Sequence, residues 1–407
     1  MTVNVSKPAF NLRDKLSELD KPVGLKGTEL MRSETVQDAR NLISAGRRNK
    51  IINGAMMFSQ RATSAADVNA GYHTVDRMRI SKNSLGTAEI THEQSTDSPN
   101  GFAKSVKTTV TTAEGSVGTA DAYRPLHYRI EGQDVQDLAY GTSDAKSLTL
   151  SFHVKSSVTG TYSLSFRNIA GTTRIRSTTY TINNANTWEK KIITIEGDTS
   201  TAIINDNATR FEIYWCGGSG TDFTSSSDGA SGWANYASAT LHYGQTVQLQ
   251  NTLNATFLLT GIQLEIGKNA TEFEHRSYGE ELALCERYCQ KFGEGWWFTG
   301  YHRGGGYSEY GYCMVPLRTT MRHGNLSVAA QGDNLHGYRY VTGGYTSAQL
   351  GSGRTASHII MNGFGAEPAV TASIRIQWQS GHGWSNDDIV HYRSLNADTF
   401  LILSAEL

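Results

Sequence analysis

Alternating apolar and polar positions run along most of the chain from about residue 51 onward. Apolar side chains recur at every second position in the stretches 148–154, 162–166 and 211–215. This alternation is typical of strands that are buried on one face. The segments between them are rich in Ser, Thr, Gly and Asn, which favour turns. The pattern therefore predicts stacked antiparallel sheets over residues 51–276, in a β-sandwich of jelly-roll type that ends at a strand around Phe257–Ile266.

The first 50 residues follow a different pattern. They hold one large aromatic residue and too few other apolar groups to close a core. Apolar residues at helical spacing predict two short helices, over 11–19 and 33–46. Helices this short are marginal in water by themselves, so we expect residues 1–50 to form an arm that becomes ordered on another protein. The docking residues that we expect are Phe10, Leu12, Leu16, Leu19, Val36 and Ile43.

Residues 277–292 carry the clearest helical pattern. Leu282, Cys285, Cys289 and Phe292 are three, four and three residues apart, a spacing that would place them on one face of a helix. Two interpretations stay open: an amphipathic helix lying on its own sheet, and a short seam between three copies of the chain. Both interpretations make this segment a helix that links two β regions.

The composition changes after Lys291, since no lysine follows while glycine, tryptophan and tyrosine are frequent. Alternating patterns near 326–329, 372–378 and 400–403 predict a second β domain over 293–407. Exposed aromatic rings can stack on sugars, and neighbouring polar groups can bind the hydroxyls. The alternative is that these rings form sheet core or a subunit interface. The candidate glycan-binding residues are Trp296, Trp297, Tyr301, His302, Arg303, Tyr307 and Tyr310.

The charge and cysteine content of the sequence limit which classes of partner and cofactor we expect. Lys+Arg (37) and Asp+Glu (38) nearly cancel, so no overall field favours nucleic acid, and no apolar run is long enough to insert into a membrane. The four cysteines lack paired C-x-x-C spacing, which favours reduced thiols in a cytoplasmic assembly environment. Cys285 and Cys289 could share a soft metal, but no second ligand pair is visible. We therefore expect buried thiols, no metal and no other cofactor.

Catalytic motifs for nucleophilic, phosphate-binding or zinc chemistry do not occur in the sequence, so we expect a protein that is not an enzyme. A glycan hydrolase would need two carboxylates roughly 5–9.5 Å apart. The acids in the aromatic-rich region are Glu294, Glu309, Asp387 and Asp388, and we expect them to cap turns or face solvent.

Three segments resemble a family of tailed-bacteriophage tail fibres and virion structural proteins. The first is Ile51-Ile-Asn-Gly-Ala-Met-Met-Phe-Ser-Gln-Arg61 with Tyr72 and Asp76-Arg-Met-Arg79. Met78 stands here in place of the more usual Trp, at a position that we expect to face a core. The second is Tyr128-Arg-Ile-Glu-Gly132 with Ala139-Tyr-Gly141 and 148–155. The third is Gly261-Ile-Gln-Leu-Glu-Ile-Gly267 with Phe273–Leu282 and Cys285-Glu-Arg-Tyr288.

This resemblance implies a jelly-roll domain similar to carbohydrate-binding modules, a distal domain near the host surface and a homotrimeric assembly. We therefore expect a virion protein that is assembled in the host cytoplasm, docks on a tail adaptor, nozzle or capsid through residues 1–50, and binds a host-surface glycan. Two alternatives remain open: a capsid-decorating fibre or tail adaptor with a purely structural role, and a glycan-degrading tailspike.

Overall fold

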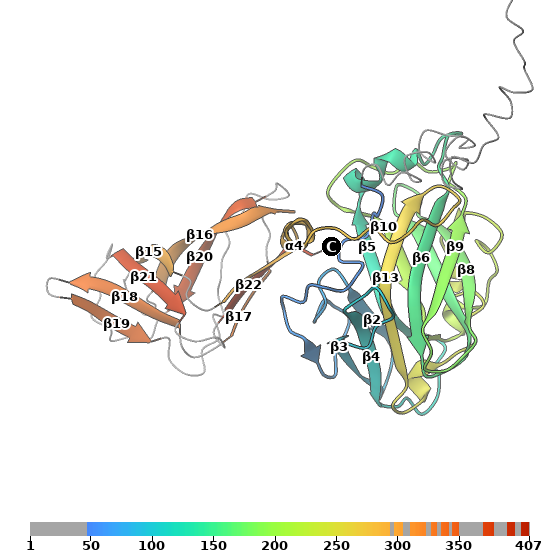
Figure 1. The fold of residues 1–407 in the computed structure, drawn as a ribbon, viewed down its shortest axis with the longest axis horizontal. Coiled ribbons are helices and arrows are strands. Elements are labelled where there is room, and N and C mark those ends of the chain that lie inside the picture. The colour runs from blue at the N-terminus through green and yellow to red at the C-terminus, as the bar shows by residue number, and fades with distance from the viewer. Residues whose placement is uncertain are drawn as a thin grey trace, which may run out of the picture.

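The structure, a computed structural model, describes residues 47–293, 297–303, 310–322, 327–331, 335–341, 344–349, 369–377, 389–394 and 400–406. Within these ranges the protein is mainly β, as predicted. Figure 1 shows a large β body and a smaller group of strands, with helix α4 (Tyr278–Glu286) between them. Among the described residues, no helix is both long and apolar enough to cross a bilayer. The predicted docking residues of the arm lie outside the described residues.

Two sheets make up the large body. The six-stranded sheet has the order β1 (Ser64–Ala65), β3 (Glu89–Ser95), β4 (Ser105–Thr112), β13 (Thr256–Ile266), β6 (Leu148–Ser156) and β9 (Glu189–Ile195). The seven-stranded sheet has the order β11 (Gly218–Ser219), β5 (Ala122–Glu131), β10 (Thr209–Trp215), β7 (Gly160–Asn168), β8 (Arg174–Ile182) and β12 (Ala234–Asn235), and β2 (Arg79–Asn83) pairs with β5. Strands distant in sequence are neighbours, such as β4 and β13, so the chain crosses between the sheets. The predicted sandwich of jelly-roll type is confirmed.

Short 3-10 turns punctuate the connections of the sandwich. They are η1 (Gly132–Leu138), η2 (Thr221–Phe223), η3 (Ser238–Thr240) and η4 (Leu249–Asn251). The segment that holds η2 and η3 packs on the outer face of the seven-stranded sheet, where Phe223 and Leu241 lie in one cluster with Tyr214 of β10.

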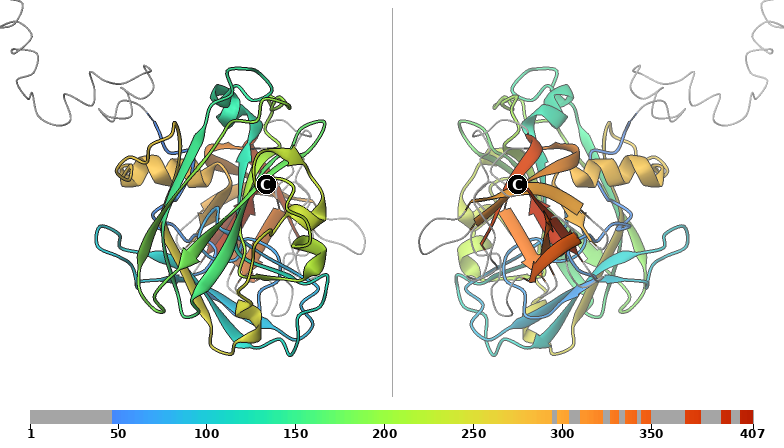
Figure 2. Two further views of the ribbon diagram at one scale, coloured as in Figure 1. Left: turned by 90° about the vertical axis from the view of Figure 1, so that its right-hand side faces the viewer. Right: turned by 90° about the vertical axis from the view of Figure 1, so that its left-hand side faces the viewer.

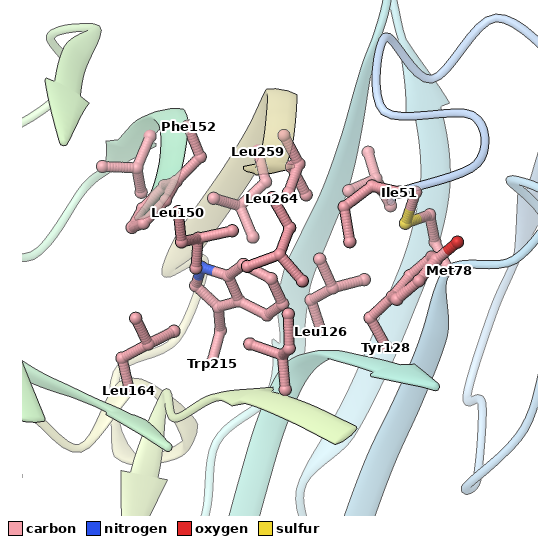
Figure 3. Close-up of a cluster of buried hydrophobic side chains, with 14 of the residues drawn as sticks. Ile51, Met78, Leu126, Tyr128, Leu150, Phe152, Leu164, Trp215, Leu259 and Leu264 are labelled. Atoms are coloured by element: carbon pink, nitrogen blue, oxygen red, sulfur yellow. The ribbon is translucent and has the colours of Figure 1, made fainter. Parts of the chain in front are cut away.

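An apolar core fills the space between the two sheets. In Figure 3 the indole of Trp215 lies among Leu126, Leu150, Leu164 and Leu264, and all five side chains are fully buried. Burial of each side chain of this size contributes about 1.5–3 kcal/mol to folding. Because successive side chains of a strand point to opposite faces, the inner face of each sheet supplies this core, and the outer faces are left for other groups.

Met78 is part of the same core and is also fully buried. The sequence predicted that this position, where Trp is more usual in the resembled family, would face a core, and the structure confirms it. Its thioether chain is flexible enough to fill an irregular space beside Ile51 and Tyr128.

The C-terminal part forms two further sheets. One has the order β14 (Cys289–Phe292), β22 (Phe400–Ser404) and β17 (Ser327–Gln331). The other has the order β19 (Gly344–Gln349), β18 (Leu335–Val341), β21 (Ile389–Ser394), β15 (Trp297–Arg303), β16 (Tyr310–Met321) and β20 (Ala369–Gln377). In Figure 1 the C-terminal end of the chain lies next to α4, between these strands and the sandwich.

The helix predicted over 277–292 is wrong in its second half. It begins where expected, with Ser277 as the N-cap accepting a hydrogen bond from the backbone of Glu280, and ends at Glu286. Residues 289–292 instead form β14, which pairs with β22 more than a hundred residues later in the chain. Both views of Figure 2 show α4 as a short helix at one side of the sandwich.

The predicted helical face of Leu282, Cys285, Cys289 and Phe292 therefore does not exist. Cys285 packs with Ile52, Phe58 and Tyr288, and Leu282 lies against the same cluster. Cys289 and Phe292 are buried on a strand. The described cysteines Cys216, Cys285 and Cys289 are buried and free, as expected for thiols that behave as small apolar groups.

Candidate binding face on the seven-stranded sheet

The outer face of the seven-stranded sheet carries charged side chains in register. Arg129 of β5 lies opposite Glu212 of β10, and Glu212 lies opposite Arg167 of β7. The Glu212 carboxylate lies 3.1 Å from Nε of Arg129 and 2.9 Å from Nη1 of Arg167. The hydroxyl of Tyr214 donates to the same carboxylate at 2.6 Å. Glu212 is therefore held at the centre of a row that spans three strands.

A second row lies beside the first. Arg79 of β2 is opposite His127 of β5, and His127 is opposite Tyr214, whose ring stacks on the imidazole with centroids 4.1 Å apart. Nη1 of Arg79 lies 3.1 Å from Nδ1 of His127, and Nε2 of His127 lies 3.1 Å from Oε1 of Glu212. A guanidinium can only donate, so Nδ1 accepts and Nε2 carries the proton that is donated to Glu212.

Arg124 completes the face through an irregularity in β5. The pairing of β5 with β2 shifts register between Arg79 and Ser81, so that Arg79 is opposite His127 and Ser81 is opposite Arg124. Arg124 and His127, three residues apart, consequently both reach the outer face. Nε of Arg124 donates to Nε2 of His242 at 2.8 Å. Its guanidinium also lies 5.5 Å from the ring centroids of Tyr214 and Phe223.

We call this surface the arginine face. It consists of Arg79, Arg124, Arg129 and Arg167 with His127, Glu212 and Tyr214.

Burial sets the protonation states of the arginine face. It lowers the pKa of His127 to about 4, and the neighbouring guanidiniums of Arg129 and Arg79 act in the same direction. It also lowers the pKa of His242 well below its usual value. Burial alone would raise the pKa of Glu212, but the hydrogen bond from His127 and the charge of Arg167 lower it to about 2. At neutral pH both imidazoles are therefore neutral and the carboxylate is ionised.

The base of the arginine face is buried while part of its outer edge is open. His127 and Glu212 are buried, whereas the side chains of Arg129 and Arg167 are 26% and 19% exposed. The Tyr236 ring lies 4.3 Å from the guanidinium of Arg167. Hydrogen-bond donors held in place by buried partners and flanked by aromatic rings are suited to bind a polar ligand, because little side-chain freedom is lost.

The glycan-binding residues predicted in the C-terminal region lie on or next to β15 and β16. Arg303 pairs with Tyr310, and Tyr301 pairs with Tyr312. Trp297 pairs with Arg393. The backbone thus brings these predicted residues to adjacent strands, with His302 between Tyr301 and Arg303. Trp296 and Tyr307 lie outside the described residues, and the choice between binding surface and sheet core stays a prediction.

The residues of the three resembled motifs meet at one place, where the sandwich, α4 and β22 join. Asn53, from the first motif, donates to the carbonyls of Phe58 and Asp76 at 2.9 Å each. Its backbone has the positive φ of 61° that Asn tolerates. The next residue, Gly54, lies so close to the carbonyl oxygen of Ile262 that a side chain there would overlap it.

Buried ion pairs connect the motifs. Glu131, from the second motif, accepts hydrogen bonds from Arg287 at 2.7 Å and from the hydroxyl of Tyr288 at 2.5 Å, both from the third motif. Arg77 pairs with Glu406 beneath the ring of Tyr288, whose centroid is 3.5 Å from the guanidinium.

Arg61 and Asp76, also from the first motif, lie beside Glu406 as well. Arg61 lies 3.3 Å from the carboxylate of Glu406 and 3.7 Å from that of Asp76. We call these seven residues the junction network: Arg61, Asp76, Arg77, Glu131, Arg287, Tyr288 and Glu406. Together they tie the C-terminal strand to the sandwich.

No protein-family model matches the sequence, and no curated protein matches it. Among solved structures, the enzymatically active domain of tailspike protein 4 from bacteriophage CBA120 is similar over 54% of this chain and 21% of its own, with 14% identity and a TM-score of 0.30. A putative sugar binding protein from Bacteroides thetaiotaomicron is similar over 54% of this chain and 100% of its own, with 13% identity and a TM-score of 0.29.

A family 11 carbohydrate-binding module from Clostridium thermocellum is similar over 56% of this chain and 100% of its own, with 10% identity and a TM-score of 0.25. Likeness at these identities and TM-scores carries no argument about function. What this protein binds must be inferred from its own residues.

The arginine face was missed by sequence reasoning. Its signal was present, because the apolar positions of β5 alternate with His127 and Arg129, and those of β10 alternate with Glu212 and Tyr214. The outward polar positions of a strand normally belong to a solvated surface. Only strand order and register bring the four arginines of β2, β5 and β7 around one carboxylate.

Proposed function

We propose that this protein is a tailed-phage fibre or related virion subunit that binds a host-surface glycan through its β-sandwich without cleaving it. The observation that carries glycan recognition is the arginine face, where four guanidinium donors on three strands of one sheet are fixed by buried partners and flanked by tyrosine rings. Fixed donors suit a hydroxyl-rich ligand, because its oxygens find partners at a low entropic cost.

The phage assignment is supported by the three motifs. Six of the seven residues of the junction network belong to these motifs, and the seventh, Glu406, follows β22, so the network connects the sandwich to that strand. This gives the motifs a physical role that does not depend on any ligand. In the proposal, residues 1–50 are the virion anchor, and the homotrimer multiplies weak glycan contacts by raising their effective concentration.

Glycan recognition is tested with the purified full-length protein on an array of bacterial surface polysaccharides. We expect reproducible binding to at least one of them and no release of oligosaccharide from the bound chain. Binding to none would contradict glycan recognition and favour the purely structural role, and oligosaccharide release would favour a tailspike.

The anchoring role is tested in particles. Deletion of residues 1–50 should abolish incorporation of the protein into the virion while glycan binding by the purified protein persists. Incorporation without residues 1–50 would contradict the anchor. The molar mass of the full chain in solution, measured by light scattering, tests the trimer.

A further inference from the structure

The arginine face has an excess of positive charge that its own residues do not neutralise. Four guanidiniums face one carboxylate, that of Glu212, which leaves three positive charges. His127 is neutral and does not change this balance. Buried or half-buried charges in proteins are normally paired, so the excess calls for a physical reason.

The excess is concentrated on two side chains. Arg129 and Arg167 share Glu212, whereas in the described part of the chain no carboxylate forms an ion pair with Arg79 or Arg124. Arg124 is only 5% exposed, and its hydrogen-bond acceptors, His242, Ser81 and Asn83, are all neutral groups. A guanidinium in this position is desolvated without a counter-charge, which costs free energy in the unliganded protein.

Strand register brings these two arginines together. They lie on adjacent strands as diagonal neighbours: Ser81, the partner of Arg124, is two residues from Arg79, and His127, the partner of Arg79, is three residues from Arg124 across the irregularity in β5. Diagonal neighbours in a sheet have Cα atoms roughly 7–8 Å apart, so two long guanidinium side chains can meet one acidic group between them. Irregularities of this kind commonly re-aim side chains beside functional sites.

Their orientation is already fixed. His127 accepts from Arg79 at 3.1 Å, and the rings of Tyr214 and Phe223 flank Arg124. Arg124 donates from Nε and Nη1 to His242, Ser81 and Asn83, which leaves its Nη2 for a ligand, and Arg79 uses Nη1 for His127. The remaining N–H donors match the oxygens of a carboxylate or of a phosphate.

We infer that the glycan bound by the arginine face is acidic, and that its carboxylate or phosphate pairs with Arg79 and Arg124. This inference rests on the proposed function and adds the chemical class of the ligand. The acidic group supplies the counter-charge that this pair of arginines lacks, while Arg129 and Arg167, already paired with Glu212, donate to neighbouring hydroxyls.

The first test uses the polysaccharide array, read for the chemistry of the bound chains. It presents uronate-bearing, sialate-bearing and phosphate-bearing polysaccharides beside neutral ones. We expect only acidic chains to bind, and we expect binding to be lost after carboxyl reduction or enzymatic dephosphorylation of the bound chain, which also separates the two sources of charge. Equal binding of neutral chains would overturn the inference and leave glycan recognition standing, whereas binding to no chain would overturn both.

The second test uses the double variant Arg79→Gln/Arg124→Gln. Loss of two charge-assisted contacts, each worth about tenfold or more in affinity, should weaken binding of the acidic chain at least a hundredfold. The control is Lys107→Gln, which removes one positive charge from the outer side of the other sheet, where Lys107 pairs with Glu93, and should leave affinity within about twofold. Unchanged affinity in the double variant would overturn the inference.

Two further measurements address misfolding of the double variant and non-specific binding of polyanions. If the double variant does not fold, as judged by circular dichroism, the single variant Arg79→Gln at a half-buried position should still weaken binding at least tenfold. Duplex DNA serves as a non-glycan polyanion, and binding of DNA as tight as that of the best polysaccharide would show a general polyanion surface and overturn the acidic-glycan assignment.

Discussion

The junction network and the arginine face are built from the same residue types but treat charge in opposite ways. Each of the three arginines of the junction network meets a carboxylate: Arg77 meets Glu406, Arg61 meets Asp76 and Glu406, and Arg287 meets Glu131. On the arginine face the described residues provide one carboxylate for four guanidiniums. The charges of the junction network are paired within the chain, whereas those of the arginine face are not balanced by the described residues.

The contrast separates structural from binding roles. Removing one partner of a complete buried pair leaves an uncompensated charge, so the junction should be intolerant of substitution. Removing an arginine that has no counter-charge takes away a desolvated ion, so folding should tolerate the change and only binding should suffer. Four measurements of stability test this difference, and the largest expected effect comes first.

Substitution of Glu131 by Gln should have the largest effect. It removes the carboxylate that Arg287 and the hydroxyl of Tyr288 share, at a fully buried position. We expect a loss of about 3–5 kcal/mol in the free energy of unfolding, measured by urea denaturation. The control Asp137→Asn breaks an exposed pair with Lys50 and should cost less than about 1 kcal/mol. Equal effects of the two variants would mean that the junction is not a buried ionic joint.

Acidification should lower the free energy of unfolding, because His127 of the arginine face resists protonation in the folded protein. The folded-state pKa of about 4 lies below the unfolded value of 6.5, so folding favours the neutral imidazole. Its contribution is complete above about pH 6.5 and is lost as the pH falls toward 4, by about 3 kcal/mol at most. In His127→Asn the free energy of unfolding should decline less over this window. Parallel pH profiles of the two proteins would contradict the assignment of a neutral His127.

Substitution of Arg167 by Met should have a moderate effect. The carboxylate of Glu212 would keep Arg129, His127 and Tyr214 but lose its contact at 2.9 Å, and the Tyr236 ring would lose the guanidinium above it. Because the Arg167 side chain is partly exposed, we expect a loss of only about 1–2 kcal/mol in the free energy of unfolding. A loss as large as that of Glu131→Gln would remove the distinction between the two regions.

Substitution of Arg124 by Met should have the smallest effect on folding. Met keeps an apolar chain between the rings of Tyr214 and Phe223 and removes a buried charge that has no carboxylate partner. We expect a free energy of unfolding within about 1 kcal/mol of the unsubstituted protein, with no systematic loss. Thermal and urea unfolding both report on it. A loss above about 2 kcal/mol would make Arg124 a structural residue.

Much of the fold could be predicted because it depends on local alternation. The strands β6, β7 and β10 were visible in the spacing of Leu148, Tyr162 and Phe211 with the apolar residues that follow each of them, and Met78 was expected in a core. The start of α4 was visible at Ser277. The end of α4 could not be predicted, because the backbone of residues 289–292 pairs with β22, and no local pattern reveals a partner so distant in sequence.

The candidate site shows the same division. The motif residues could be recognised in the sequence. Their contacts around Glu131 and Glu406 could not be predicted, because these contacts form only when the third motif and the segment after β22 fold back on the first two motifs. Aromatic richness drew attention to Trp297 and Tyr301. The arginine face contains no distinctive local sequence motif, so nothing in the sequence distinguished Arg79 and Arg124 from solvated surface arginines.

By itself the sequence determined which side of each strand is apolar, and hence that the chain folds as stacked β-sheets, because burial of apolar side chains acts at period two along every strand. Only the tertiary structure decided which polar sides share a surface. Strand order and the irregularity in β5 place Arg79 beside Arg124 and leave them without a carboxylate. Charge balance is a property of neighbours in space, and neighbours across a sheet are not neighbours in sequence.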